Sequence, residues 1–167
     1  MIHHLAHQDG TCFIGEGTRI WQFASIIRKS SIGKSCSIAS GVSIDGARVG
    51  DRCVIGHNCS INPGVWIGDG VFIGPLVTFC NDMWPRASKE GFDADHLLDG
   101  SALTAIVKDG ASIGAGVTIL PGLTIGEGSI IAAGLTVTRS VPKNSIYWRN
   151  GTISEIIPGH HERIILA

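Results

Sequence analysis

A six-residue repeat of apolar residues dominates this sequence and restricts its fold more than any other feature. Steps of six residues from Ile14 reach an isoleucine five times in succession, and after one step of five to Val49 they continue as far as Phe79. The register returns at Val107 and runs to Val137. It occupies eighteen positions: Ile14, Ile20, Ile26, Ile32, Ile38, Ile44, Val49, Ile55, Ile61, Ile67, Ile73, Phe79, Val107, Ile113, Ile119, Ile125, Ile131 and Val137.

This period excludes the commonest secondary structures. A helix with period 3.6 cannot keep a six-residue repeat on one face, and a flat strand alternates with period two. Three short strands per turn satisfy the repeat if each strand sends one branched residue inward. A β-sandwich would need alternating strands at intervals of about 8–12 residues, which are absent. Three repeats per turn make about six coils of a parallel β-helix, roughly 29 Å long at ~4.8 Å per coil.

Glycine supports the same fold. The chain has 23 glycines among 167 residues, and a glycine directly follows the apolar residue at eight of the repeat positions. We expect these glycines to occupy the corners, where the backbone must bend between one short strand and the next.

The repeat is interrupted once and then ends. The segment 80–106 is polar and irregular, and long loops on rigid scaffolds are usually functional. Its apolar residues Trp84, Phe92, Leu97 and Leu98 predict that it packs against a neighbouring subunit. We expect one domain over residues 1–167. Its short C-terminal tail, 143–167, should cover the last coil, whose open strand edge would otherwise template association.

Composition excludes several classes of partner. Charged residues make up only 16% of the chain and the formal net charge is −1, with no basic block for nucleic acid or an anionic membrane. No apolar run approaches the roughly 18 residues of a membrane span, and the start of the chain lacks a signal-peptide core. The five cysteines are scattered without a C-x-x-C pair, which indicates reduced thiols and a cytoplasmic protein.

Three segments resemble one family. Residues 14–23 (IGEGTRIWQF) look like the opening coil of the left-handed β-helix acyltransferases. Residues 79–86 (FCNDMWPR) resemble the F-x-N-D-x-(aromatic)-P-R motif of bacterial N-acetyltransferases acting on dTDP-3-amino-3,6-dideoxyhexoses. Residues 113–139 are similar to the family's shared acetyl-CoA-binding coils. The resemblance covers about residues 12–142, and the tail beyond Asn144 departs from it.

This resemblance implies both winding and activity. It implies left-handed coils and a homotrimer with three active sites at subunit interfaces. It also implies direct transfer of acetyl from acetyl-CoA to the 3-amino group of a dTDP-linked 3-amino-3,6-dideoxyhexose. Related enzymes that act on UDP-linked aminoglucuronates tend to carry a different residue after the Asn, and a UDP-linked amino sugar stays an alternative acceptor.

The loop motif also favours an amine acceptor on chemical grounds. A sugar amine with a pKa near 8 attacks a thioester once it has lost its proton, and fixed geometry supplies much of the remaining barrier. A hydroxyl acceptor depends far more on a general base, usually His. Hydroxyl-acetylating enzymes of this fold place a His after the corresponding coil, where this chain has Asn81 and Asp82. The loop's only histidine is His96.

The resemblance assigns roles to the motif residues. Asn81 would orient the amine or donate to the oxyanion, and Asp82 would accept a hydrogen bond from the ammonium or a sugar hydroxyl. Both residues are also common in plain turns. Arg86 is suited to a phosphate, with a surface ion pair as the alternative. Trp84 would stack on thymine or pin the loop.

The family binds pantetheine in a groove between two subunits, where side chains are small. The matching positions are Ala115 and Ala133, eighteen residues apart, with Thr138 and Arg139 nearer the nucleotide end. Arg139 would meet a CoA phosphate. Small residues are required at a corner whether or not a cofactor binds there. The two alanines therefore indicate only the position of the groove, and their side chains take no part in the reaction.

Several alternatives stay open. An O-acetyltransferase would use His96 or His57 as its base, and His57 is otherwise a structural or substrate-binding residue in a subunit groove. A β-helix zinc hydrase would need two closely spaced His ligands within the coils, which are absent, so we expect no metal. Cys80 has no His beside it in sequence to activate it as an acyl-enzyme nucleophile. A non-catalytic scaffold would not bind acetyl-CoA.

Overall fold

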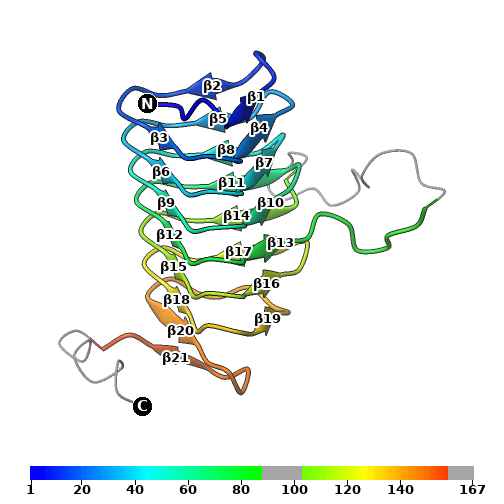
Figure 1. Ribbon diagram of the computed structural model, residues 1–167. Helices are drawn as coiled ribbons and strands as arrows, with labels where there is room; N and C mark the ends of the chain where they lie inside the picture. Colours follow the sequence, from blue (N-terminus) through cyan, green and yellow to red (C-terminus); the bar gives the residue numbers. More distant parts are fainter. Residues whose placement is uncertain (88–102, 158–167) are drawn as a thin grey trace.

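The protein is an all-β solenoid built from three sheets that run along one axis, with every strand pair parallel except the last, β20–β21 (Figure 1). The computed structural model describes residues 1–87 and 103–157, and no helix occurs in these two ranges. Each turn of the chain contributes one short strand to each sheet. The parallel β-helix predicted from the repeat is therefore confirmed.

The sheets contain seven, six and eight strands. The seven-stranded sheet contains β1 (His7–Gln8), β4 (Ser25–Ile27), β7 (Ser43–Asp45), β10 (Ser60–Ile61), β13 (Thr78–Phe79), β16 (Thr118–Ile119) and β19 (Thr136–Val137). The six-stranded sheet contains β2 (Phe13–Ile14), β5 (Ser31–Ile32), β8 (Arg48–Val49), β11 (Val65–Ile67), β14 (Ala105–Val107) and β17 (Leu123–Ile125). The eight-stranded sheet contains β3 (Arg19–Ile20), β6 (Ser37–Ile38), β9 (Val54–Ile55), β12 (Phe72–Ile73), β15 (Ser112–Ile113), β18 (Ile130–Ile131), β20 (Ser145–Tyr147) and β21 (Ile153–Glu155).

The strand register reproduces the repeat. Ile20 pairs with Ile38, eighteen residues on, whereas Ile32 pairs with Val49, because the single five-residue step shortens that coil by one. The solenoid is about one turn longer than the six coils expected. Strand β1 adds a strand before the repeat register begins, and β20 adds one after it ends.

The repeat positions form the core. Seventeen of the eighteen are buried, and Ile14 in the first coil is partly buried. A second inward column lies two residues earlier in each hexad and holds small side chains, including the buried thiols of Cys36, Cys53 and Cys59. The Sγ atoms of Cys53 and Cys59 donate to the carbonyl oxygens of Gly68 and Gly74, both at 3.1 Å. All five cysteines are free thiols.

The glycines of the repeat have a different role from the one expected. None of the eight that follow an apolar repeat residue has a positive φ, so they do not make the bend. A Cβ at Gly114 would instead lie 2.6 Å from the backbone nitrogen of Ala133, and one at Gly56 would lie 2.5 Å from that of Pro75. These positions need glycine because successive coils approach closely there. The bend is made nearby, for example at Gly116 and Gly134, where φ is +67° and +73°.

The solenoid resumes before the interrupting segment 80–106 ends. Thr104 is fully buried and β14 begins at Ala105, so the last residues of this segment already belong to the next coil. His96, Phe92, Leu97 and Leu98 lie outside the described residues, so the packing of this loop on another subunit stays a prediction.

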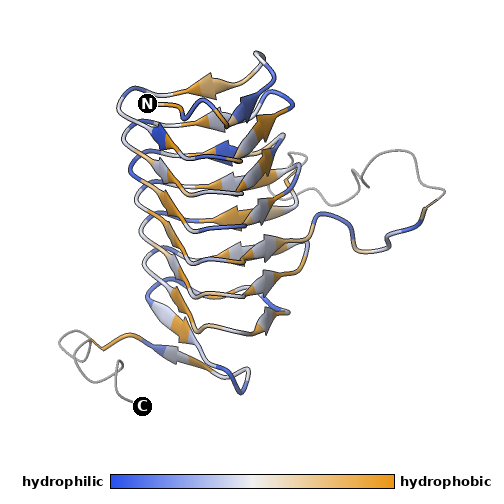
Figure 2. Ribbon diagram, viewed as in Figure 1, coloured by the Kyte–Doolittle hydropathy of each residue, from blue (hydrophilic) through white to orange (hydrophobic). Residues whose placement is uncertain are grey.

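The start of the tail continues the solenoid. Strand β20 pairs in parallel with β18, and β21 turns back antiparallel onto β20, so both lie over the last coil (Figure 1). Figure 2 shows that the apolar residues recur coil after coil along the solenoid. In the part of the chain that the structure describes, no helix is long and apolar enough to cross a membrane.

Candidate functional site

Two corners of the solenoid carry the residues predicted from the sequence. The chain turns from the seven-stranded to the six-stranded sheet at what we name the Asn81 corner, which in successive coils includes residues 28, 45–46, 62–63, 80–82, 120–121 and 138–139. It turns from the eight-stranded to the seven-stranded sheet at the Ala115 corner, which includes residues 22–23, 40–41, 57–58, 75–76, 115–116 and 133–134. The seven-stranded sheet separates the two corners.

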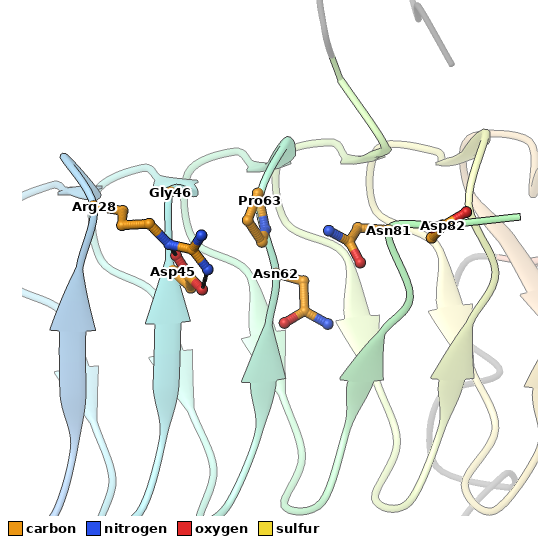
Figure 3. Close-up of a pocket in the computed structure, with 7 residues that line it drawn as sticks. All are labelled: Arg28, Asp45, Gly46, Asn62, Pro63, Asn81 and Asp82. Carbon is orange, nitrogen blue, oxygen red and sulfur yellow. Dashed lines mark hydrogen bonds and ion pairs between the residues drawn. The ribbon is translucent and has the colours of Figure 1, made fainter. Parts of the chain in front are cut away.

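An open groove of about 600 Å³ runs along the Asn81 corner (Figure 3). The residues that line it come from four successive coils: Arg28, Asp45, Gly46, Asn62, Pro63, Asn81 and Asp82. The strand register explains the order, because Ile27 pairs with Asp45, and Ile61 pairs with both Ile44 and Phe79. Asp45 and Asn62 therefore come one residue after the inward residue of their coils, whereas Arg28 and Asn81 come two residues after it.

Asn81 and Asp82 lie together at one end of this groove. Strand β13 ends at the buried Phe79, and the chain leaves the solenoid two residues later. The Nδ2 atom of Asn62 donates to the carbonyl oxygen of Phe79 at 2.7 Å and so fixes that departure. The half-buried side chain of Asn81 makes no hydrogen bond to any described residue, so its amide is available to a ligand.

Asp82 makes a turn. One of its carboxylate oxygens accepts a hydrogen bond from the backbone N–H of Trp84 at 2.8 Å, the short-range bond by which an Asp side chain builds its own turn. Asp82 therefore makes the local bond expected of a turn residue, whereas the Asn81 side chain makes no such bond. Asp82 nevertheless lines the groove beside Asn81.

Cys80 is not activated as a nucleophile. Desolvation by burial raises the pKa of its thiol, which disfavours the thiolate that acyl transfer through sulfur requires.

Trp84 and Arg86 extend beyond the groove. Trp84 is 69% exposed and Arg86 is also exposed, and neither lines the groove that contains Asn81. Any contact of these two side chains with a substrate must therefore be made outside the groove walls.

The predicted cofactor residues are divided between the two corners. Ala115 is exposed and Ala133 half-buried at the Ala115 corner, one coil apart, where the N–H of Gly134 donates to the carbonyl oxygen of Ala115 at 2.8 Å. His57 is exposed at this same corner, two coils earlier, and so lies across the seven-stranded sheet from Asn81. In these last two coils the corner carries only the small residues Ala115, Gly116, Ala133 and Gly134, so its backbone is accessible there.

Thr138 and Arg139 lie instead at the Asn81 corner, past the end of β19. Both are exposed. The Arg139 guanidinium donates to the carbonyl oxygen of Gly151 and lies 6.0 Å from the ring of Tyr147, so this side chain already has contacts with the tail.

Sequence reasoning missed the other half of the groove. Arg28 and Asp45 form an ion pair there, with the guanidinium Nε and Nη2 atoms donating to the two carboxylate oxygens (Figure 3). The signal in the sequence was a polar residue directly after an inward isoleucine, as in Ile44-Asp45 and Ile61-Asn62. A second groove, of about 690 Å³, lies over the six-stranded sheet, where Lys108 Nζ lies 4.8 Å from the centre of the Trp66 ring.

Within residues 1–87 and 103–157, no three His, Cys, Asp or Glu side chains are grouped so that they could hold a metal ion.

The repeats match a known family. The model of the bacterial transferase hexapeptide family (six repeats) matches residues 46–81 and 104–139. These two segments are therefore hexapeptide repeats, and the fold is the left-handed parallel β-helix of that repeat. A search of the curated proteins finds no match.

Solved structures of similar fold include enzymes that handle CoA and nucleotide sugars. A variant of GDP-perosamine N-acetyltransferase from Caulobacter crescentus, in complex with CoA and GDP-perosamine, is 19% identical with a TM-score of 0.61, covering 92% of this chain and 55% of that one. The acetyltransferase domain of PglB from Neisseria gonorrhoeae, in complex with acetyl coenzyme A, is 13% identical with a TM-score of 0.58, covering 87% and 52%. This chain spans about half the length of both.

AntD from Bacillus cereus, an N-acyltransferase in complex with dTDP and 3-hydroxybutyryl-CoA, aligns over more of its length. It is 21% identical with a TM-score of 0.58, and the alignment covers 99% of this chain and 82% of that one. At these identities the likeness shows the fold.

Proposed function

We propose that the protein is an acetyl-CoA-dependent N-acetyltransferase of nucleotide-linked amino sugars. The acceptor we assign is the 3-amino group of a dTDP-3-amino-3,6-dideoxyhexose. The observation that carries the proposal is the groove at the Asn81 corner. At one end of this groove the side-chain amide of Asn81 makes no hydrogen bond to the described residues, and at the other end lies the guanidinium of Arg28. These are the groups that a developing oxyanion or amine and an anionic carrier require. The CoA, GDP-sugar and dTDP complexes of the similar structures support the substrate class.

The reaction is a direct attack within a ternary complex. The neutral amine nitrogen forms a bond to the thioester carbon, and the carbonyl oxygen becomes an oxyanion. When the tetrahedral intermediate collapses, the carbon–sulfur bond breaks and CoA leaves as its thiolate, which takes the proton that the nitrogen loses. Asn81 orients the amine or donates its Nδ2–H to the oxyanion. Trp84 and Arg86 would contact the acceptor from the loop.

A second subunit completes the site in this proposal. The predicted pantetheine position at Ala115 and Ala133 and the proposed acceptor position at Asn81 lie on opposite edges of the seven-stranded sheet. A closed threefold oligomer would bring the Ala115 corner of one subunit against the Asn81 corner of the next. Thr138 and Arg139 would then meet the nucleotide end of CoA.

Exposed apolar residues on the Ala115 corner support this assembly. Phe23 and Leu76 are 67% and 61% exposed, and their φ angles are +62° and +61°, in the left-handed region that bulky residues avoid. The equivalent positions in the lower coils are Gly116 and Gly134. Bulky apolar side chains that are exposed in a single chain are expected at a surface that another subunit covers.

The proposal is tested by measuring CoA release from acetyl-CoA with a panel of acceptors. The panel contains dTDP-3-amino-3,6-dideoxyhexoses of gluco and galacto configuration, a UDP-linked and a GDP-linked amino sugar, and the corresponding hydroxyl sugars. We expect turnover with the amines and none with the hydroxyl sugars. Turnover confined to a hydroxyl sugar would favour the O-acetyltransferase with His57 or His96 as base, and no binding of acetyl-CoA would favour a scaffold.

A further inference from the structure

Arg28 occupies the end of the groove farthest from Asn81. Its corner position is equivalent to those of Gly46, Pro63 and Asn81 in the next three coils, so three coil steps of ~4.8 Å separate it from Asn81, about 14 Å. Among the residues that line the groove, Arg28 is the one cation. Figure 3 shows its side chain extending from its own coil towards the next, along the groove.

The turn that carries Arg28 is held in an unfavourable conformation. Arg28 and Lys29 follow one another with φ angles of +53° and +59°, in the left-handed region. The first coil stabilises this turn: the backbone N–H of Arg28 donates to the Asp9 carboxylate at 2.6 Å, and that of Lys29 donates to Thr11 Oγ1 at 2.9 Å. These two hydrogen bonds hold the turn, and with it the start of the Arg28 side chain, in a defined position at the groove.

Asp45 holds the Arg28 guanidinium in place but accepts only some of the hydrogen bonds that this guanidinium can donate. Its side chain is 13% exposed and that of Arg28 is 66% exposed, so the carboxylate lies under a cation that faces solvent. Of the five guanidinium N–H groups, two are given to Asp45. The Nη1 atom makes no hydrogen bond to the described residues, which leaves a planar pair of donors suited to phosphate oxygens.

We propose that Arg28 binds the diphosphate of the nucleotide-linked acceptor and thereby places the sugar amine beside Asn81. This inference rests on the proposed function and names the anchor of its acceptor. A hexose joined to a diphosphate is comparable in length to the separation between Arg28 and Asn81. Binding one end of the acceptor to Arg28 would bring the amine at its other end to the amide.

Arg52 provides a matched control. It also has a left-handed φ, +55°, and also pairs with an aspartate seventeen residues on, Asp69, at 3.3 Å. It lies between the six-stranded and eight-stranded sheets and does not line the groove. Glycine adopts the left-handed region without strain, so Arg28→Gly and Arg52→Gly remove each side chain while suiting the backbone.

The experiment measures dTDP binding by calorimetry and acetyl transfer by steady-state kinetics on the intact protein and both variants. We expect Arg28→Gly to raise the Kd of dTDP and the KM of the dTDP-linked amine by ten- to a hundredfold, since it removes charge-assisted hydrogen bonds. The KM for acetyl-CoA and the saturated kcat should change less than about twofold, and Arg52→Gly should change none of these. Unchanged dTDP binding in Arg28→Gly, or an equal loss in Arg52→Gly, overturns the inference. A native protein that acetylates no nucleotide-linked amine overturns the proposed function instead, and dTDP binding reports separately on Arg28.

Discussion

Asn62 donates its side-chain amide to the carbonyl oxygen of Phe79, 2.7 Å away, across one coil of the solenoid. The turn that Asn62 begins also receives the returning chain. The N–H of Thr104 donates to the carbonyl oxygen of Gly64 at 2.8 Å, and Thr104 Oγ1 donates to that of Pro63 at 3.0 Å. Residues 62–64 thus anchor both ends of the insertion and set the position of Asn81 in the groove.

Asn62→Ala should therefore affect stability and activity together. Loss of the hydrogen bond to Phe79 should lower the free energy of unfolding by about 0.5–1.5 kcal/mol. The kcat of acetyl transfer should fall because Asn81 is less well placed. Denaturant unfolding and steady-state kinetics measure the two effects. Ser43→Ala is the control on the same sheet, since Ser43 makes no side-chain hydrogen bond to the described residues; an equal kcat loss there would refute the positioning role.

The cofactor position at Ala133 can be tested by filling it. Ala133→Phe should raise the Kd of acetyl-CoA at least tenfold, because a bulky side chain would occupy the corner where pantetheine is expected, and the core should stay intact. Ser40→Phe is the control, four coils away in the equivalent position of the same corner. Calorimetric titration with acetyl-CoA reports the result, and unchanged affinity in a folded Ala133→Phe protein would place the cofactor elsewhere.

Mixing two inactive variants tests whether the site is shared between subunits. Asn81→Ala and Ala133→Phe damage opposite corners, so coexpressed mixed trimers should contain some interfaces in which both corners are intact. We expect activity well above that of either variant alone. Mixtures no more active than the separate variants, or sedimentation of the native protein as a 17.6 kDa monomer, would show that a single chain holds the whole site.

The turn that presents Arg28 should become less stable in acid. Hydrogen bonds from the Thr11 side chain and from the backbone N–H groups of Thr11 and Arg28 hold the pKa of Asp9 below its ordinary value. Because the folded-state pKa is the lower one, the stabilisation is complete above the ordinary carboxyl pKa and is lost as the pH falls through the folded one. The Tm difference between the native protein and Asp9→Ala should be greatest at neutral pH and shrink below roughly pH 4. A difference independent of pH would remove Asp9 from this role.

The fold could be read from the sequence because its signal is local. Each inward residue, such as Ile55 or Ile113, is specified by its own hexad, and a regular period fixes the number of strands per turn. The prediction that the repeat glycines make the bend is wrong. Glycine is needed at Gly114 because the neighbouring coil approaches it closely at Ala133, and the residues around Gly114 in the sequence do not reveal that contact.

The candidate site was only partly accessible from sequence. The motif located Asn81 and Asp82, since they are adjacent along the chain. Arg28 and Asp45 were missed, because their pairing and their place in the groove depend on the stacking of coils that are far apart in the sequence. The stacking of the coils also places His57 at the Ala115 corner, away from Asn81, and no local sequence pattern indicated this position.

The comparison of Asn81→Ala with His96→Ala tests most directly whether the protein acetylates an amine at Asn81. His96 lies outside the described residues, and the amine needs no histidine base because it can lose its proton to water or to the departing thiolate. We predict that Asn81→Ala lowers kcat on a dTDP-linked amine by ten- to a thousandfold, equivalent to about 1.4–4 kcal/mol of transition-state stabilisation, with little change in the KM for acetyl-CoA. His96→Ala should lower kcat less than Asn81→Ala does at every pH between about 6 and 9, the range around the amine pKa. Loss of turnover in His96→Ala with retention in Asn81→Ala would contradict the account and favour transfer to a hydroxyl group.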